Sequence, residues 1–387
     1  MNRERAKDIF RKNTMLLALI LVMVLFQIMI VQQGKGSMFA PTNITNLINQ
    51  NSYVVILATG MLMCIITGGN IDLSVGSVVA LIGAVAGVMV VNMGLSVPLT
   101  IVVCLLLSTA IGAWQAFWIA YMRIPPFIVT LAGMLTFRGV AWIVLGSKTI
   151  SPFPPEYSKI FSNYLSGNAP AIVMAVAAVI CLVFVFAQVF SRVQRKKKNF
   201  EVEPLWLLAS KLVLVSAAVL AVFWLLSQNK GIPVILILLA AIVLIYAYYT
   251  QNTVAGRHLY AFGGNEKAAK LSGINTNRTM FFAYTNMGFL SGVAALVCVA
   301  RFNSAAPSAG DGYEMDAIAS CFIGGASAYG GTGTVSGAVI GAIFMGVLNN
   351  GMSIMGIDQN WQRTVKGLVL LAAVIFDVVN KRRTQST

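Results

Sequence analysis

Ionisable side chains inside or beside hydrophobic segments are the residues of this chain best suited to handle a polar solute. Arg138 lies within an apolar run, and Asp72 and Asp316 each stand directly before one. A charge in the hydrocarbon of a bilayer costs at least about 2.5 kcal/mol, so such groups tend to face a polar interior. Arg138 could line a route for a polyhydroxylated solute, pair with a carboxylate or brace two helices, and the aspartates could instead cap helices.

Both aspartates lie in glycine-rich interruptions of apolar sequence, from Gly68 to Ser77 and from Tyr313 to Thr334. An inverted-topology repeat would produce this match, with halves of four spans each at 49–146 and 279–379. Small residues also serve close helix packing in lipid, which is the alternative explanation. The predicted translocation path comprises Asp72, Ser74, Arg138, Asp316, Gly324 and Gly325.

The sequence lacks the residue patterns that catalysis would need. It has no G-x-x-x-x-G-K-[ST] loop to hold nucleotide phosphates, and its one histidine, His258, has no cysteine or histidine partner at metal-ligand spacing. The five cysteines show no paired spacing such as CxxC. We therefore expect a non-catalytic chain without a metal or cofactor, in which any ATP-driven step belongs to another polypeptide.

Composition predicts an all-α, polytopic membrane protein. Of 387 residues, 58% are hydrophobic and only 10% are charged, with a mean hydropathy of +0.81. A soluble chain of this size would need more surface charge. About twelve segments are long enough, or nearly so, to cross a hydrocarbon core. They are 15–31, 53–67, 73–91, 97–121, 127–145, 169–190, 205–226, 232–249, 280–300, 317–328, 335–348 and 364–379.

Basic clusters between these segments predict the orientation, because loops rich in lysine and arginine stay in the cytoplasm. The first span follows five basic residues without an A-x-A-like cleavage site, so we expect an uncleaved anchor and a cytoplasmic N-terminus. Twelve crossings then place the 192–198 cluster, the 250–278 loop and the C-terminal tail in the cytoplasm. The same parity puts Asp72 and Asp316 on opposite sides. Positive-inside topology explains the net charge of +15 better than nucleic-acid binding does.

The polar loop from Gly256 to Asn275 is predicted to contact another protein. Asn265 can cap a short helix, Glu266 suits its positive end, and Gly273 can end it in the left-handed conformation. An apolar face of this helix would comprise Ala268, Ala269 and Leu271. The alternative is a connecting loop that only ends one helix and starts the next.

Four stretches carry the pattern of one family. They are TGGNIDLSVGSVVALIGA (Thr67 to Ala84), RIPPFIVTLAGMLTFRG (Arg123 to Gly139), GRHLYAFGGNEKAAKLSGIN (Gly256 to Asn275), and the block from Ala300 through MDAIASCFIGGASAYGGTGTVSGAVIGA to WQRTVKG. Through them the chain resembles permease subunits of the ribose, xylose and galactose class of bacterial ABC importers. The resemblance covers most of the chain. An extra hairpin at 169–228 departs from the core pattern and makes the chain most similar to the xylose or multiple-monosaccharide branch.

The resemblance implies a single permease domain over 1–387, with an inverted-repeat core, a peripheral 169–228 hairpin and a coupling loop at 250–278. It also implies a bacterial inner-membrane location, a second permease copy, cytoplasmic ATPase subunits and an external binding protein that delivers a monosaccharide. The residues expected to couple to the ATPase are Gly256, Arg257, Gly263, Gly264, Asn265, Glu266, Ala268, Ala269, Leu271 and Gly273.

Other functions remain open on the residues alone. An ion-coupled secondary carrier would also have about twelve spans, but it would need carboxylates at membrane depth, whereas Asp72, Asp316 and Asp377 fall at predicted span ends. A membrane scaffold would leave the capped loop and the matched glycine breaks unexplained. An importer permease for another small solute, such as an amino acid, is the nearest alternative.

Overall fold

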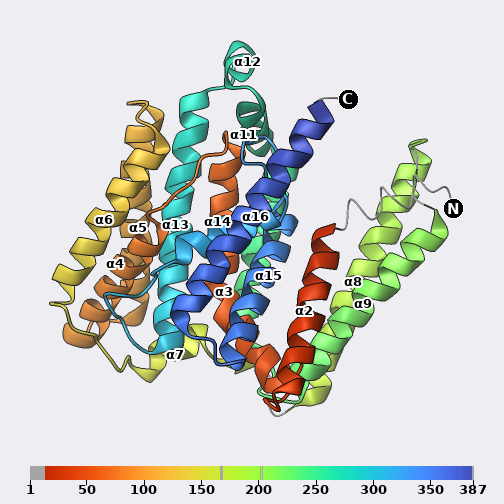
Figure 1. Cartoon of the computed structure of the whole chain (residues 1–387), viewed down its shortest axis with the longest axis horizontal. Coiled ribbons are helices and arrows are strands. Elements are labelled where there is room, and N and C mark those ends of the chain that lie inside the picture. Colours follow the sequence, from red (N-terminus) through yellow and green to blue (C-terminus); the bar gives the residue numbers. More distant parts are fainter. Residues whose placement is uncertain (1–13, 166–168, 201, 203, 386–387) are drawn as a thin grey trace.

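The computed structural model describes residues 14–165, 169–200, 202 and 204–385, and this part of the chain is almost entirely helical (Figure 1). The basic residues before position 13, which carry the predicted cytoplasmic N-terminus, lie outside it. Its 15 α-helices are α2 (Thr14–Gln32), α3 (Pro41–Ile66), α4 (Val75–Gly87), α5 (Val97–Ala120), α6 (Pro126–Val144), α7 (Pro155–Phe161), α8 (Pro170–Lys197), α9 (Leu205–Ser227), α10 (Val234–Asn252), α11 (Val254–Gly264), α12 (Glu266–Leu271), α13 (Thr276–Phe302), α14 (Tyr313–Ile323), α15 (Val335–Ile354) and α16 (Gln359–Gln385).

Two minor elements complete this inventory. A π-helical turn, η1 (Val88–Asn92), continues α4 to the length of a membrane span. The strands β1 (Tyr164–Leu165) and β2 (Ile232–Pro233) pair antiparallel and join the end of α7 to the start of α10. Among the described residues, the fold is therefore all-helical apart from this two-residue ladder and an isolated bridge between Ile150 and Ala305.

Ten helical segments within the described ranges are long and apolar enough to cross a membrane, so the chain is a multi-pass membrane protein. The sequence predicted about twelve spans, and α14 is the clearest difference. With 11 residues it is about 16 Å long, too short for a hydrocarbon core of about 30 Å. The other difference is α16, which is long enough but carries Lys366, Asp377 and Lys381 in its apolar run.

Proline starts several of the spans. Pro41, Pro126 and Pro170 occupy the first turn of α3, α6 and α8. At that position the missing proline N–H is not needed, because the first backbone N–H groups of a helix have no partner within it, and the fixed φ suits the helix. Each boundary is therefore set locally, by a residue that cannot continue the preceding helix.

The two long helices α3 and α13 form the buried centre of the bundle. α13 packs against α5, α3 packs against α15, α4 packs against α6, and α14 packs against α16. α5 and α13 approach so closely at Gly112 and Gly288 that a Cβ on Gly288 would lie 2.5 Å from the Ser108 carbonyl oxygen. Small residues at such crossings let helix backbones come together where lipid supplies no hydrophobic driving force.

The hairpin of α8 and α9 stands at the side of the bundle (Figure 1). The two helices pack on each other around a small buried cluster that includes Val173, Ala177 and Phe223. Asn229, just after α9, ties the hairpin to α3 by donating a hydrogen bond from Nδ2 to the Thr45 hydroxyl at 2.9 Å. Most of the surface of both helices faces away from the bundle.

Candidate functional site

The predicted coupling loop folds into two short helices, α11 and α12, that form a corner at one end of the bundle (Figure 1). Thr253 caps α11, because its hydroxyl accepts a hydrogen bond from the Gly256 N–H at 3.0 Å. Asn265 caps α12 as predicted, accepting from the Ala268 N–H at 3.0 Å. Gly273 has φ +85° and ends the corner. The sequence predicted α12 but missed α11, for which the threonine cap three residues before Gly256 was the available signal.

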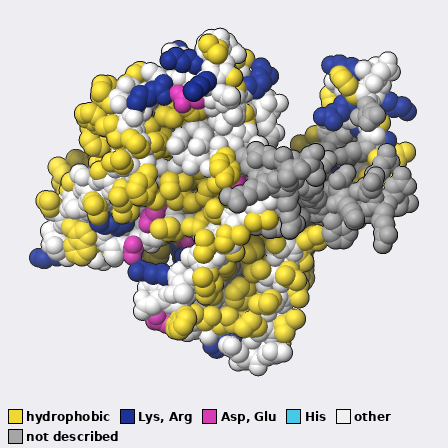
Figure 2. Space-filling view, turned by 45° about the horizontal axis from the view of Figure 1, so that its top comes forward, with side chains coloured by type: hydrophobic (Ala, Val, Ile, Leu, Met, Phe, Trp, Pro, Cys, Tyr) yellow, Lys and Arg dark blue, Asp and Glu magenta, His cyan; other side chains and the backbone are white. Residues whose placement is uncertain are grey.

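α12 projects from the bundle and divides its apolar residues between two faces. Ala269 is buried, whereas Ala268 is exposed and Leu271 is 90% exposed. The predicted single apolar face was therefore wrong in grouping Ala269 with the other two. Figure 2 shows lysine and arginine side chains around this end of the molecule. The exposed basic residues there include Arg257, Lys267, Lys270 and Arg278.

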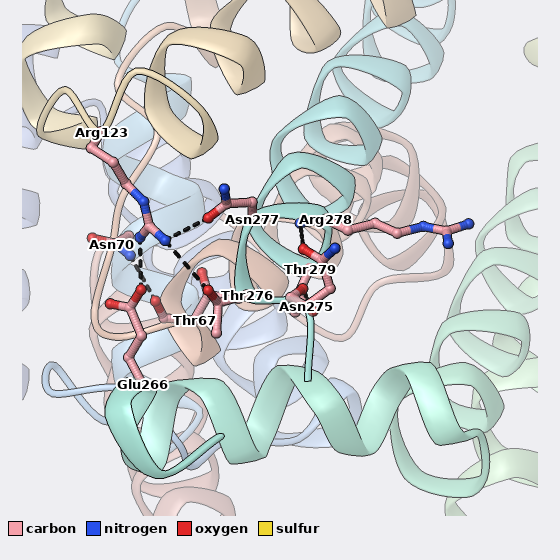
Figure 3. Close-up of polar contacts among 9 residues, drawn as sticks. All are labelled: Thr67, Asn70, Arg123, Glu266, Asn275, Thr276, Asn277, Arg278 and Thr279. Atoms are coloured by element: carbon pink, nitrogen blue, oxygen red, sulfur yellow. Dashed lines mark hydrogen bonds and ion pairs between the residues drawn. The ribbon is translucent and has the colours of Figure 1, made fainter. Parts of the chain in front are cut away.

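Arg123 clamps the corner to the rest of the bundle (Figure 3). It lies in the loop between α5 and α6, with φ +59°. Its Nη1 lies 2.6 Å from Glu266 Oε1, and its Nη2 donates to the Thr276 hydroxyl at 3.4 Å and to Asn277 Oδ1. The pair with Glu266 is about half exposed, so it contributes little to stability and mainly fixes geometry. Sequence reasoning missed Arg123 as a site residue, although it is a lone arginine before two prolines at a predicted cytoplasmic turn.

Backbone contacts bind the same corner to two distant loops. A Cβ on Gly263 would lie 1.7 Å from the Ile66 carbonyl oxygen and 2.6 Å from the Gly331 nitrogen. The Gly331 N–H itself donates to the Ile66 oxygen at 2.9 Å. Gly264, by contrast, has nothing within 4 Å of an added Cβ. The end of α11 thus rests directly on the end of α3 and on the turn that follows α14.

The two loops also touch each other, again through glycines. An added Cβ on Gly69 would lie 1.9 Å from the Ala328 oxygen, and one on Gly330 would lie 2.4 Å from the Gly68 Cα. We call this meeting of Gly68–Gly69, Gly263 and Gly330–Gly331 the glycine junction. At its rim the Tyr260 hydroxyl donates to the Gly333 oxygen at 2.8 Å. The glycine breaks that the sequence assigned to a translocation path therefore meet the predicted coupling loop.

Asp72 is 2% exposed and has only neutral partners among the described residues. Its Oδ1 accepts from the Ser74 N–H at 2.8 Å and from the Ser74 hydroxyl at 2.7 Å, and Gln115 Nε2 donates to that hydroxyl at 2.8 Å.

Asp316 is 1% exposed and has a cation as its partner. Lys366 Nζ of α16 lies 3.0 Å from Oδ1, and the Tyr53 hydroxyl of α3 donates to Oδ2 at 2.9 Å. The Tyr53 ring stacks on Tyr313 with 3.7 Å between centroids. Asp316 therefore links three helices, α3, α14 and α16.

Two predictions about these acids were wrong. Both carboxylates are buried in the bundle, so the argument against an ion-coupled carrier from missing deep acids does not hold. Their helices also do not start on opposite faces, because a Cβ on Gly76 at the start of α4 would lie 2.1 Å from the Gly310 oxygen and 2.4 Å from Glu314 Oε2 at the start of α14. Both helices start inside the bundle, although the segments that lead to them come from its opposite ends, from α3 at the glycine junction and from the far end of α13.

The remaining path candidates make packing contacts. Arg138 Nη1 donates to the Pro307 oxygen at 3.0 Å and to the Ala309 oxygen, so it braces the loop before α14. A Cβ on Gly324 would lie 2.2 Å from the Gly337 oxygen, which keeps α14 close to α15. Gly325 has φ +86°, a conformation that favours glycine. In the coupling loop, Gly256 is buried, with the Tyr249 oxygen 2.2 Å from an added Cβ.

Comparison with known proteins covers nearly the whole chain. Residues 43–374 match the family described as branched-chain amino acid transport system, permease component. The chain is 39% identical over 370 residues to the xylose transport system permease protein XylH of Escherichia coli (strain K12), covering 96% of this chain and 92% of that protein. It is 39% identical over 369 residues to XylH of Haemophilus influenzae, covering 95% and 96%. The ribose import permease protein RbsC of Escherichia coli (strain K12) is 32% identical over 363 residues, covering 94% and 93%. No solved structure matches significantly.

Removing the Arg123 side chain should loosen α12 without unfolding the protein. In Arg123→Ala we expect the amides of α12 to exchange hydrogen about two- to fivefold faster, in keeping with the roughly 0.2–1 kcal/mol of an exposed ion pair. Hydrogen–deuterium exchange with mass spectrometry measures this, and the melting temperature should stay unchanged. Lys270→Ala is the matched control, because the Lys270 side chain has no hydrogen bond or ion pair within the described residues. Equal exchange rates of the α12 amides in both variants would show that Arg123 does not stabilise α12.

Proposed function

This chain belongs to the family of permease components of branched-chain amino acid and monosaccharide ABC importers, and we propose that it carries xylose, or a related pentose or hexose, into the cytoplasm. As a permease component it is the non-catalytic membrane part of a sugar importer. The observation that carries the choice of sugar is 39% identity to two xylose permeases over at least 95% of this chain. The ribose permease follows at 32%. An amino acid is the alternative solute, because the family description includes such importers.

Family membership also weighs against an ion-coupled carrier. Both buried carboxylates already have partners, Ser74 for Asp72 and Lys366 with Tyr53 for Asp316. The driving force would instead come from a separate ATPase. A binding protein outside the cell would deliver the sugar, and a second copy of the chain would complete the pathway in the inner membrane.

The α11–α12 corner is the surface that we propose for the ATPase. It projects beyond the ends of the spans and presents Ala268 and Leu271 to the surroundings. The exposed apolar face of a helix can lie in a hydrophobic groove on a partner. With this end in the cytoplasm, the C-terminal end of α16 lies on the same side (Figure 1), as the predicted topology requires.

The packing pattern supports an inverted repeat of four elements. α3, α4, α5 and α6 would correspond to α13, α14, α15 and α16. The contact of α13 with α5 then matches that of α3 with α15, and the contact of α4 with α6 matches that of α14 with α16. The hairpin of α8 and α9 lies outside both sets, which supports its interpretation as a peripheral insert.

The function is tested by reconstitution. In proteoliposomes with its ATPase and binding protein, the chain should take up labelled D-xylose only when ATP is supplied on the cytoplasmic side. The chain alone should move no sugar under a proton or sodium gradient, because a permease component of this family depends on a separate ATPase for its energy. Gradient-driven uptake by the chain alone would refute the proposal, and uptake of leucine in place of xylose would favour the amino-acid alternative.

Charge on the exposed face of α12 should abolish ATPase binding. We expect Ala268→Asp combined with Leu271→Asp to lose co-purification of the ATPase while membrane insertion is retained, because a buried partner pocket would then face two unpaired carboxylates. Phe200→Asp is the control, since Phe200 is an exposed apolar residue at the end of the hairpin. Normal co-purification and transport by the double variant would show that α12 is not part of the ATPase interface.

A methyl group at the glycine junction should uncouple transport from ATPase binding. Gly263→Ala places a carbon within 1.7 Å of the Ile66 oxygen, so α11 must shift, at a cost of about 1–3 kcal/mol. We expect the ATPase still to co-purify and xylose uptake to fall by at least about tenfold, which is the rate equivalent of 1.4 kcal/mol. The adjacent Gly264→Ala is the matched control, because its Cβ meets nothing within 4 Å. Equal uptake by the two variants would contradict this role.

A further inference from the structure

A small polar pocket lies at the end of α13 that is far from α12. It has a volume of about 250 Å³ and is lined by residues that include Asn46, Asn49, Phe161, Ser162, Tyr164 and Arg301. Arg301 lies 25 residues beyond Thr276, where α13 leaves the coupling corner, so about 37 Å of helix separates the two sites. If α12 faces the cytoplasm, the pocket opens toward the side from which a sugar arrives.

Tyr164 is held in position from three sides. Its backbone pairs with Pro233 in the β1–β2 ladder, Asn49 Nδ2 donates to its hydroxyl oxygen at 2.9 Å, and Lys230 Nζ lies 5.5 Å from its ring centroid. These contacts leave the Tyr164 hydroxyl proton and the Asn49 amide oxygen available. The pocket thus offers a fixed donor beside a fixed acceptor, and the Phe161 ring adds an apolar wall.

Arg301 is fixed as well. Its Nη1 donates to the Gln50 backbone oxygen at 3.3 Å, and its guanidinium lies 4.6 Å from the Phe302 ring centroid. A guanidinium has five N–H donors, so most of them remain for another partner. Asn46 is exposed, and its side chain makes no hydrogen bond with the residues that the structure describes.

The lining chemistry identifies the class of ligand. Among the residues that the structure describes, no carboxylate lines the pocket and Arg301 is its one charged lining residue. The rest of that polar lining consists of neutral amides and hydroxyls that both donate and accept. Hydroxyl groups need such two-sided partners, and aromatic walls suit the apolar faces of a sugar ring. Drug-sized ligands occupy pockets of about 300–1,000 Å³, so 250 Å³ fits something smaller.

From this arrangement we propose that the pocket is a binding site for a single neutral monosaccharide on the receiving side of the permease. The proposal rests on the sugar-import function above, because that function supplies the polyhydroxylated ligand. Binding there is expected to be weak, since few of the polar groups are buried and each neutral hydrogen bond contributes only about 0.5–1.5 kcal/mol. A weak site suits a permease that must release its cargo.

The experiment measures binding to the purified full chain in lipid nanodiscs, without ATPase or binding protein. Saturation-transfer difference NMR with D-xylose and D-ribose should show transfer to at least one sugar for the wild type. Asn46→Trp fills the pocket with an indole and should abolish this transfer. Asn46→Ala removes one partner and should weaken binding by about two- to tenfold. Asn92→Ala is the control, because Asn92 is also exposed and lies outside the pocket.

Two results would overturn the site: no transfer to either sugar in the wild type, or unchanged transfer in Asn46→Trp. Melting temperatures of all variants exclude misfolding as the cause of a loss. This failure is distinct from failure of the transport function, because reconstituted uptake is measured separately. A wild-type complex that imports xylose while Asn46→Trp binds it normally would refute the pocket and leave the function intact.

Discussion

Contact between three stretches of backbone at the glycine junction determines how the α12 end of this bundle is built. Gly263 can rest on the Ile66 backbone oxygen only because it has no side chain, since an added Cβ would lie 1.7 Å from that oxygen. The Gly331 N–H then satisfies that same oxygen at 2.9 Å. Irregular backbone in a membrane protein is tolerated where protein covers it, and here each glycine loop is covered by the other and by α11. The corner, the end of α3 and the turn after α14 are therefore packed backbone against backbone.

The polar side-chain contacts at this end have a different role from the backbone contacts of the glycine junction. The ion pair between Arg123 and Glu266 is about half exposed and contributes little free energy. Its role is to fix the orientation of α12 relative to α13, because Arg123 also donates hydrogen bonds to Thr276 and Asn277 at the start of α13. Backbone contact resists compression of α11 against α3, and the arginine limits rotation of α12 about that contact. Force applied to the exposed Leu271 can thus reach the loops that precede α4 and follow α14.

Much of this fold could be predicted from the sequence, and the errors have a common cause. Hydropathy and proline positions predict the long spans such as α5, and the Asn265 cap predicts α12. Hydropathy cannot show that a helix starts inside the bundle, so the sequence predicted a full span at α14 and placed Asp316 at the surface. Burial of Ala269 and exposure of Leu271 depend on which face of a six-residue helix meets the bundle. Arg123 was missed because its partner Glu266 lies 143 positions away.

The two buried acids show that the halves of the bundle differ chemically although their packing corresponds. Asp316 is buried and faces the ammonium of Lys366, whose side chain is 22% exposed, and a buried carboxylate that loses its cation is left uncompensated. Asp72 is held by the Ser74 hydroxyl and N–H, and hydrogen bonds to a charged group contribute about 1.5–3 kcal/mol each. The Ser74 contacts are local, within two residues of Asp72, whereas Lys366 reaches Asp316 from another helix. A shift between α4 and its neighbours can therefore preserve the partners of Asp72, while a shift between α14 and α16 must break those of Asp316.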